Sequence, residues 1–209
     1  MKNSVVVSEL DRQVLSIIRA NVVSFMRHCS VAYGKSSGLL LDIAPQEHEG
    51  ARPFFSEYIS VKTLDIDPHS ACDFIADICS HNESILDSSF EYVVCTEVLE
   101  HTLNPFGAVR EIWRVLKPGG FLFGSTPFNF RIHGPLPDCW RFTEHGLRAL
   151  LKDFEVVELN QVDTPERDLM PMHYTFVAKR PVSNRARIER KGHIFNPFDS
   201  NELKGVDPK

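Results

Sequence analysis

The chain has 209 residues, of which 43% are hydrophobic and 24% are charged, and its formal net charge is −5. This length fits one domain with a substantial core, with or without an appendage. A nucleic-acid-binding protein usually carries a basic face, which the acidic balance does not supply, so we expect no nucleic-acid partner.

The five cysteines are odd in number and show no CxxC spacing, so the sequence predicts neither a disulfide framework nor a metal site. No apolar run approaches the length of a membrane span, and the N-terminus has no apolar signal region. These absences predict a cytoplasmic protein without a membrane partner.

The first expected element is a helix over residues 8–28. Apolar side chains recur there at helical spacing and form one face that is apolar except for Asn21. Ser8 and Asp11 have the spacing of a capping box. We expect an N-terminal helical segment over residues 1–34, a main domain over 35–180, and a tail or arm over 181–209.

Strand-like and helix-like patterns alternate through the main domain. The expected strands are residues 39–43, 60–67, 72–78, 90–95, 120–126, 154–159 and 173–179. The clearest helices are residues 104–116 and 143–151. Such alternation indicates βαβ units with right-handed connections. The predicted fold is α/β, a doubly wound, Rossmann-like sheet of seven strands, mostly parallel, with the last strand antiparallel.

Acidic side chains follow the second and third expected strands, where open parallel sheets bind their ligands. Asp65 and Asp67 end the second strand, and a carboxylate there can accept hydrogen bonds from both ribose hydroxyls of a nucleotide. Asp77 follows the third strand and can accept from an adenine amine. Each aspartate equally fits a turn or a cap, and both interpretations stay open.

Three short motifs follow one another between residues 98 and 143. Residues 98–101 read VLEH, residues 111–120 read EIWRVLKPGG, and residues 126–143 contain TPF, a histidine, PD and WRFT in that order. In combination they resemble the class I S-adenosylmethionine-dependent methyltransferases, and most closely a small bacterial subgroup. The resemblance extends over residues 39–159.

The resemblance implies methyl transfer with S-adenosylmethionine as the cofactor. Residues 42–46 would wrap its methionine moiety, Asp65 would hold the ribose, Asp77 would hold the adenine, and residues 95–97 would line the sulfonium side. The implied cofactor-binding residues are Asp42, Ala44, Gln46, Asp65, Ile66, Asp77, Ile78, Cys95 and Glu97.

The loop after the first strand departs from the family pattern of Asp-x-Gly-x-Gly-x-Gly. Residues 42–50 read DIAPQEHEG, so no glycine occupies the tight turn. Glycine permits a positive φ and a close approach of backbone to ligand. Ala44 fits this turn if its φ stays negative, and Pro45 fixes its own φ. The departure leaves open a degenerate methyltransferase-fold protein that serves as a cofactor-binding or scaffold partner. A nicotinamide-dependent oxidoreductase is disfavoured, because the G-x-G-x-x-G loop is absent.

The segment over residues 128–143 is expected to form the acceptor side of the site. His133 is the expected catalytic base, because an imidazole titrates near neutrality, and Asp138 is the second candidate. The expected substrate-binding residues are His101, Phe128, Trp140 and Arg141.

Structural roles stay open for several of these residues. Trp140 also fits core packing, and Arg141 also fits a salt bridge to Glu100 or Asp138. The expected partner is a small-molecule acceptor, for which similar sequences favour a sugar or nucleotide-sugar hydroxyl. A homodimer is left open.

Overall fold

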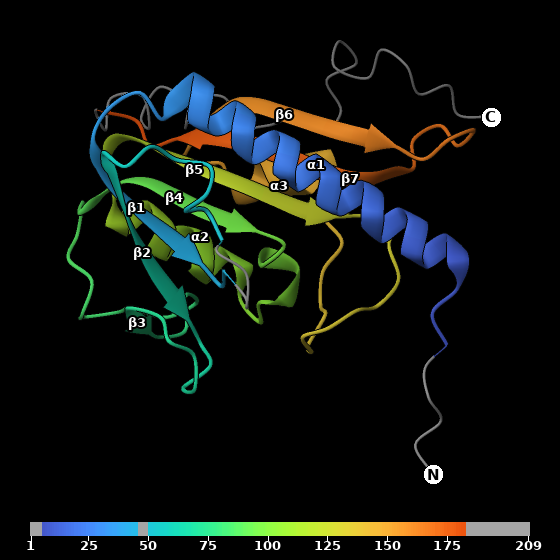
Figure 1. Ribbon diagram of the computed structural model, residues 1–209, viewed down its shortest axis with the longest axis horizontal. Helices are drawn as coiled ribbons and strands as arrows, with labels where there is room; N and C mark the ends of the chain where they lie inside the picture. The colour runs from blue at the N-terminus through green and yellow to red at the C-terminus, as the bar shows by residue number, and fades with distance from the viewer. Residues whose placement is uncertain (1–5, 46–49, 183–209) are drawn as a thin grey trace.

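The computed structural model describes residues 6–45 and 50–182. Within these residues, seven strands form one sheet in the order β3-β2-β1-β4-β5-β7-β6 (Figure 1). The strands are β1 (Gly38–Ile43), β2 (Ile59–Asp65), β3 (Phe74–Ile75), β4 (Phe90–Thr96), β5 (Leu116–Pro127), β6 (Glu155–Asp163) and β7 (Pro171–Lys179). The strands β1 to β5 pair in parallel, and β7 runs antiparallel to both β5 and β6. The predicted mostly parallel sheet with a reversed last strand is confirmed.

The strand order reverses at β1, which pairs with β2 on one side and with β4 on the other. The connections that leave β1 and β4 therefore diverge at their carboxyl ends. Such a point opens a crevice in which doubly wound folds bind ligands.

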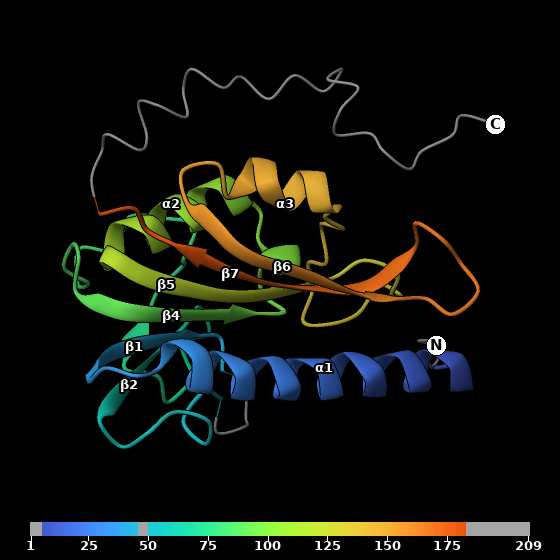
Figure 2. The same ribbon diagram turned by 90° about the horizontal axis from the view of Figure 1, so that it is seen from above.

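Three α-helices cover the sheet within the described residues: α1 (Glu9–Tyr33), α2 (Pro105–Val115) and α3 (Glu144–Leu150). Figure 2 shows α1 along one face and both α2 and α3 along the other. The Ser8 and Asp11 side chains form the predicted capping box, and α1 continues to Tyr33, beyond its predicted end. None of the helices described combines the length and apolar character that a membrane crossing requires.

Three strands depart from their predicted bounds by more than two residues: β5, β3 and β6, which continues to Asp163 instead of ending at residue 159. The strand β5 begins at Leu116, so residues 117–120 belong to it rather than to a turn before it. Gly119 has a φ of 85°, and the pairing with β4 is irregular between Phe90 and Tyr92, so the Pro-Gly-Gly segment forms a distorted strand start. The strand β3 is reduced to two residues.

The two faces of β4 belong to two different hydrophobic clusters. Val93 and Cys95 pack with α2 and α3, whereas Tyr92 and Val94 pack with α1. This alternation follows from the two-residue period of a strand. It directs Val94 and Thr96 toward the space beneath α1 and Cys95 away from it.

Candidate active site

A cavity of about 1420 Å³ lies between α1 and the carboxyl ends of β1 and β4. Its walls come from α1, the loop after β1, the end of β4 and the loop after β5. The residues predicted for the site that line it are Asp42, Ala44, Glu97, His101 and His133. The fold therefore brings together one part of the expected cofactor loop and one part of the expected acceptor wall.

The loop after β1 contradicts the expectation for Ala44. Its φ is 52°, in the left-handed region, where a non-glycine residue costs roughly 1–2 kcal/mol. Its N–H donates to the Leu64 carbonyl oxygen at 2.7 Å, which continues the β1–β2 ladder and holds the residue in place. The chain thus keeps the backbone turn that glycine serves in the family pattern, and Ala44 carries the strain.

Gly50, at the far end of this loop, lies directly against the Asp42 side chain. Its φ is 58°, and a Cβ at this position would lie 2.2 Å from Asp42 Oδ2. The same Asp42 oxygen accepts a hydrogen bond from the Ala51 N–H at 2.7 Å. Asp42 is only 3% exposed, and burial raises the pKa of its carboxyl to about 6. Gln46, also predicted to bind cofactor, lies outside the described residues.

The two expected nucleoside carboxylates lie outside the cavity. Asp65 is half-buried at the end of β2 and accepts from the Asp67 N–H at 2.9 Å. Asp77 is exposed and accepts from the Cys79 N–H at 2.8 Å. Both therefore make the turn contacts that the structural interpretation required.

Three further residues of the predicted cofactor-binding set lie away from the cavity. Ile66 is 66% exposed, whereas Ile78 and Cys95 are buried in the cluster beneath α2 and α3. Burial raises the pKa of the Cys95 thiol. None of the three lines the cavity.

Glu97 joins the cavity to the interior through a chain of polar contacts. Its Oε1 accepts from the Ser125 hydroxyl at 2.8 Å and lies 2.7 Å from His173 Nε2. His173 is fully buried, and its Nδ1 lies 2.8 Å from Asn21 Nδ2 on α1. One feature of the sequence points to this network of polar contacts: Asn21 is the exception on an apolar helix face. No sequence signal points to His173 or Ser125.

The loop after β5 is held by an ion pair. Arg141 donates to both carboxylate oxygens of Asp138, at 2.5 and 2.7 Å, and to the Arg131 carbonyl oxygen at 3.0 Å. Asp138 Oδ2 accepts from the His133 N–H at 2.9 Å and lies 3.0 Å from His133 Nδ1. The Arg141 guanidinium holds the pKa of Asp138 well below its usual range. Burial lowers the pKa of His133.

Three residues expected to bind substrate have structural contacts and do not line the cavity. Arg141 forms the salt bridge to Asp138 that the sequence left open. Trp140 donates from Nε1 to the Thr102 carbonyl oxygen at 2.7 Å and stacks on Phe142. Phe128 packs against the cluster beneath α2 and α3. Of the four predicted residues, His101 alone lines the cavity.

Glu100 is a residue that the sequence did not single out for function. It belongs to the 3-10 helix η1 (Leu99–His101) and is fully buried. Among the described residues, neither of its carboxylate oxygens has a hydrogen-bond partner. Its Oε1 lies 3.8 Å from Nε2 of both His101 and His133. Burial, and then the nearby Glu97, raises the pKa of Glu100 well above its usual range.

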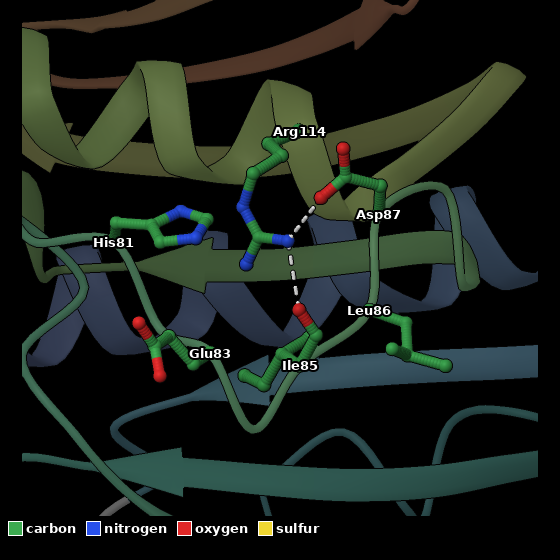
Figure 3. Close-up of a pocket in the computed structure, with 6 residues that line it drawn as sticks. All are labelled: His81, Glu83, Ile85, Leu86, Asp87 and Arg114. Atoms are coloured by element: carbon green, nitrogen blue, oxygen red, sulfur yellow. Dashed lines mark hydrogen bonds and ion pairs between the residues drawn. The ribbon is translucent and has the colours of Figure 1, made fainter.

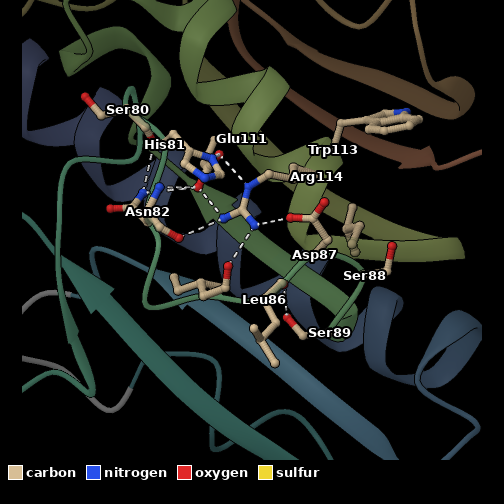
Figure 4. A network of polar contacts seen from close by, with 12 residues as sticks. Ser80, His81, Asn82, Leu86, Asp87, Ser88, Ser89, Glu111, Trp113 and Arg114 are labelled. Carbon is tan, nitrogen blue, oxygen red and sulfur yellow. Dashed lines mark hydrogen bonds and ion pairs between the residues drawn. The ribbon is translucent and has the colours of Figure 1, made fainter.

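A second hollow of about 540 Å³ lies beside α2 and is lined by His81, Glu83, Ile85, Leu86, Asp87 and Arg114 (Figure 3). Arg114 donates to both Glu111 oxygens, to Asp87 Oδ1 and to two carbonyl oxygens, so all three guanidinium nitrogens are engaged (Figure 4). This arginine of the RVLKPGG motif anchors the segment before β4 to α2. It leaves no free donor for a ligand.

Comparison with known proteins supports the resemblance found in the sequence. Residues 41–124 match the family described as Methyltransferase domain. A ubiquinone biosynthesis O-methyltransferase of Xanthomonas oryzae is 53% identical over 38 residues, which cover 18% of this chain and 16% of that protein. A polyketide synthase-nonribosomal peptide synthetase of Aspergillus clavatus is 25% identical over 84% of this chain and 4% of that protein. The chain thus spans a small part of these curated relatives.

Solved structures share the fold at low sequence identity. The 1,6-didemethyltoxoflavin-N1-methyltransferase of Burkholderia thailandensis has a TM-score of 0.55 at 16% identity, over 86% of this chain and 93% of that chain. The N-methyltransferase NodS of Bradyrhizobium japonicum has a TM-score of 0.56 at 14% identity, over 78% and 88%. Both were solved with S-adenosylhomocysteine. The [4+2]-cyclase SpnF has a TM-score of 0.61 at 16% identity, over 78% and 81%.

The matched domain and the shared fold make this chain similar to class I S-adenosylmethionine-dependent methyltransferases. S-adenosylmethionine is the cofactor that this class of protein uses, and the crevice at the β1–β4 switch point is where the fold would hold it.

Proposed function

We propose that the chain transfers a methyl group from S-adenosylmethionine to a small-molecule acceptor bound in the cavity beneath α1. The observation that carries the proposal is that Asp42 and Ala44 of the loop after β1 line the same cavity as His101 and His133. The cavity of about 1420 Å³ exceeds the roughly 300–1,000 Å³ that usually serves one small ligand. It therefore has room for a cofactor and an acceptor side by side.

The residues around β1 fit the cofactor. When bound, S-adenosylmethionine supplies an electrophilic methyl group on a sulfonium. The Asp42 carboxylate and the backbone of the loop would hold its methionine moiety. Asp65 would hold the ribose, since Ile43 pairs with Leu64 and the next residue of β2 therefore lies beside the cavity-lining Ala44.

The loop after β5 carries a side chain that would remove a proton from the acceptor. We assign His133 as the base that removes the proton from an acceptor hydroxyl, because it lines the cavity and its backbone N–H is held by Asp138. The Asp138 side chain is fully buried and paired with Arg141, so it serves to position the backbone of His133. It takes no proton itself.

The acceptor proposed is a sugar or nucleotide-sugar hydroxyl. Two arginines from different walls, Arg19 and Arg131, line the cavity. Arg131 Nη1 is buried without a hydrogen bond, 3.6 Å from Asp11 Oδ2. Guanidinium groups recognise phosphate oxygens through paired N–H donors, which favours an acceptor that carries phosphate.

The alternative is a methyltransferase-fold protein that acts as a scaffold or regulatory partner. The strained Ala44 in a loop without the usual glycines favours it. The fold alone does not decide, because the [4+2]-cyclase SpnF shares it.

Calorimetry with S-adenosylmethionine and S-adenosylhomocysteine tests the proposal first. We expect both to bind; if neither binds, the chain is a scaffold. A screen of sugars and nucleotide sugars, followed by mass spectrometry, then identifies the acceptor. With an acceptor in hand, His133→Ala should lower turnover at least about 100-fold and leave cofactor affinity nearly unchanged. Full turnover of this variant would remove His133 from the mechanism.

A further inference from the structure

The buried carboxylate of Glu100 has no role in the function proposed above. Its side chain is 0% exposed, and both oxygens lack a hydrogen-bond partner among the described residues. A buried carboxyl group without a partner is unfavourable, and an unsatisfied group of this kind calls for an unseen water, ion or ligand. The polar groups that face Glu100 Oε1 are two imidazole nitrogens.

The three side chains converge on a small volume. Glu100 Oε1 lies 3.8 Å from His101 Nε2 and 3.8 Å from His133 Nε2, and the ligand atoms of all three residues lie within 4.8 Å of one another. Donors that share a cation at about 2.1 Å each lie roughly 3.0–3.4 Å apart. For one ion to be shared by all three side chains, rotation must shorten the two edges to Glu100 by about 0.4 Å or more, and the edge between the two histidines, which is at most 4.8 Å, by up to about 1.4 Å or more.

The far nitrogen of each ring faces an acceptor. His101 Nδ1 lies 2.9 Å from the Pro137 carbonyl oxygen, which can only accept, so Nδ1 carries the proton. His133 Nδ1 lies 3.0 Å from Asp138 Oδ2 without a hydrogen bond to it, and this nitrogen has no hydrogen-bond partner among the described residues. The His101 ring therefore presents an unprotonated Nε2 toward Glu100, and a proton on His133 Nδ1, facing the Asp138 carboxylate, would leave the Nε2 of that ring free as well. Metal-binding histidines are oriented in this way, by a carbonyl or carboxylate behind the ring.

We propose that Glu100, His101 and His133 form a binding site for one divalent transition-metal ion. Two imidazoles and one carboxylate suit Zn²⁺, Fe²⁺ or Mn²⁺, whereas Mg²⁺ and Ca²⁺ prefer sites built of oxygen. His101 and His133 line the cavity, so the remaining coordination positions open toward the acceptor. The cysteine-free ligand set explains why the sequence predicted no metal.

One consequence rests on the proposed function. An acceptor oxygen on an open coordination position would lose its proton more readily, because a bound cation stabilises the negative charge. In the metal-loaded protein His133 would be a ligand to the ion, the ion would lower the pKa of the acceptor hydroxyl, and the proton would pass to the solvent. The metal site itself depends on no assumption about methyl transfer.

Titration of the chelator-treated chain, prepared without a histidine tag, tests the site directly. We expect Zn²⁺ and Mn²⁺ to bind at one ion per chain, and Co²⁺ to give visible absorption bands from nitrogen and oxygen ligands. Ion binding should also raise the melting temperature, because it favours the folded state. Neither S-adenosylmethionine nor an acceptor is needed, so this test and that of the proposed function can fail separately.

Two ligand variants and one control decide the location. Glu100→Gln and His101→Ala should each weaken binding at least about 100-fold, since even changes behind a ligand cost about 10- to 100-fold. His69→Ala, which changes an exposed histidine outside the cavity, should bind as the parent does. Absence of binding to the parent overturns the proposal. The melting curve shows whether each ligand variant folds. A folded variant that binds as tightly as the parent and gives the same Co²⁺ bands also overturns the proposal.

Discussion

His173 Nε2 lies 2.7 Å from Glu97 Oε1, although the two residues are 76 positions apart in the chain. An ionised carboxylate only accepts, so Nε2 donates, and Nδ1 then accepts from Asn21 Nδ2 at 2.8 Å. These two contacts connect the cavity-lining carboxylate of Glu97 to His173 on β7 and, through it, to Asn21 on α1. They make α1 part of the site's support as well as one of its walls.

Asn21→Leu should destabilise the fold by about 1–3 kcal/mol, because it leaves the buried His173 Nδ1 without a donor. For a chain of this size, each kcal/mol lowers the melting temperature by about 2–4 °C. Thermal unfolding followed by circular dichroism measures the loss. Gln13→Leu, which makes a similar exchange at an exposed position of α1, should change stability by less than about 0.5 kcal/mol. Equal effects of the two substitutions would contradict the assignment.

Ala44→Gly should stabilise the fold by about 0.5–1 kcal/mol. Glycine removes the roughly 1–2 kcal/mol cost of a left-handed alanine, and its greater freedom in the unfolded chain takes back part of that gain. Denaturant unfolding measures the change as a shift of the midpoint at constant slope. Ala20→Gly, in the middle of α1, should destabilise by about 1 kcal/mol. A loss at position 44 as large as that at position 20 would show that the turn is not left-handed.

Asp42→Asn should change how stability depends on pH. The pKa of this buried carboxyl is raised from 3.8 to about 6, so between these values the folded chain keeps a proton that the unfolded chain has lost. Stability from this group is therefore full below pH 3.8 and falls as pH rises to about 6, by at most about 3 kcal/mol. The variant lacks this loss. Its stability relative to the parent should rise across that window and stay constant above it. Parallel profiles would place the carboxyl in a less buried setting.

The succession of strands and helices, and with it the mostly parallel sheet, could be predicted from sequence because each strand and helix carries its own local hydrophobic period. The conformation of Ala44 could not, since a ladder hydrogen bond to Leu64 imposes it from a neighbouring strand. Partners far apart in the chain, such as Glu97 with His173, leave no mark in a single sequence. The VLEH motif did not indicate a functional role for Glu100. That role depends on His133, which lies 33 positions further along the chain and comes within 3.8 Å of Glu100 only in the folded structure.

The motifs that gave the resemblance mix support with chemistry. Arg141 and Trp140 of WRFT hold the loop after β5, and neither lines the cavity. His133, in the same stretch, does line it. A motif therefore identifies the loop, and only its contacts show which side chains face a ligand.

Asp65→Ala should weaken S-adenosylmethionine binding if the carboxylate accepts from both ribose hydroxyls. Loss of a pair of charge-assisted hydrogen bonds costs about 2–3 kcal/mol, which is a factor of about 30 or more in affinity. The register of β1 and β2 sets Asp65 beside the cavity-lining Ala44. Calorimetry on parent and variant measures the ratio of dissociation constants.

A structural role of Asp65 must be separated from this contact, because its Oδ1 also accepts from the Asp67 N–H at 2.9 Å. Asp65→Asn keeps an oxygen for that turn but removes the charge and one acceptor, so it should fold as the parent does and still bind the cofactor more weakly. Asp67→Ala, two residues further along the chain, is the matched comparison and should have the smaller effect on the affinity for S-adenosylmethionine. Equal binding by the parent and Asp65→Ala would end the assignment, and a larger loss with Asp67→Ala would transfer the ribose contact to Asp67.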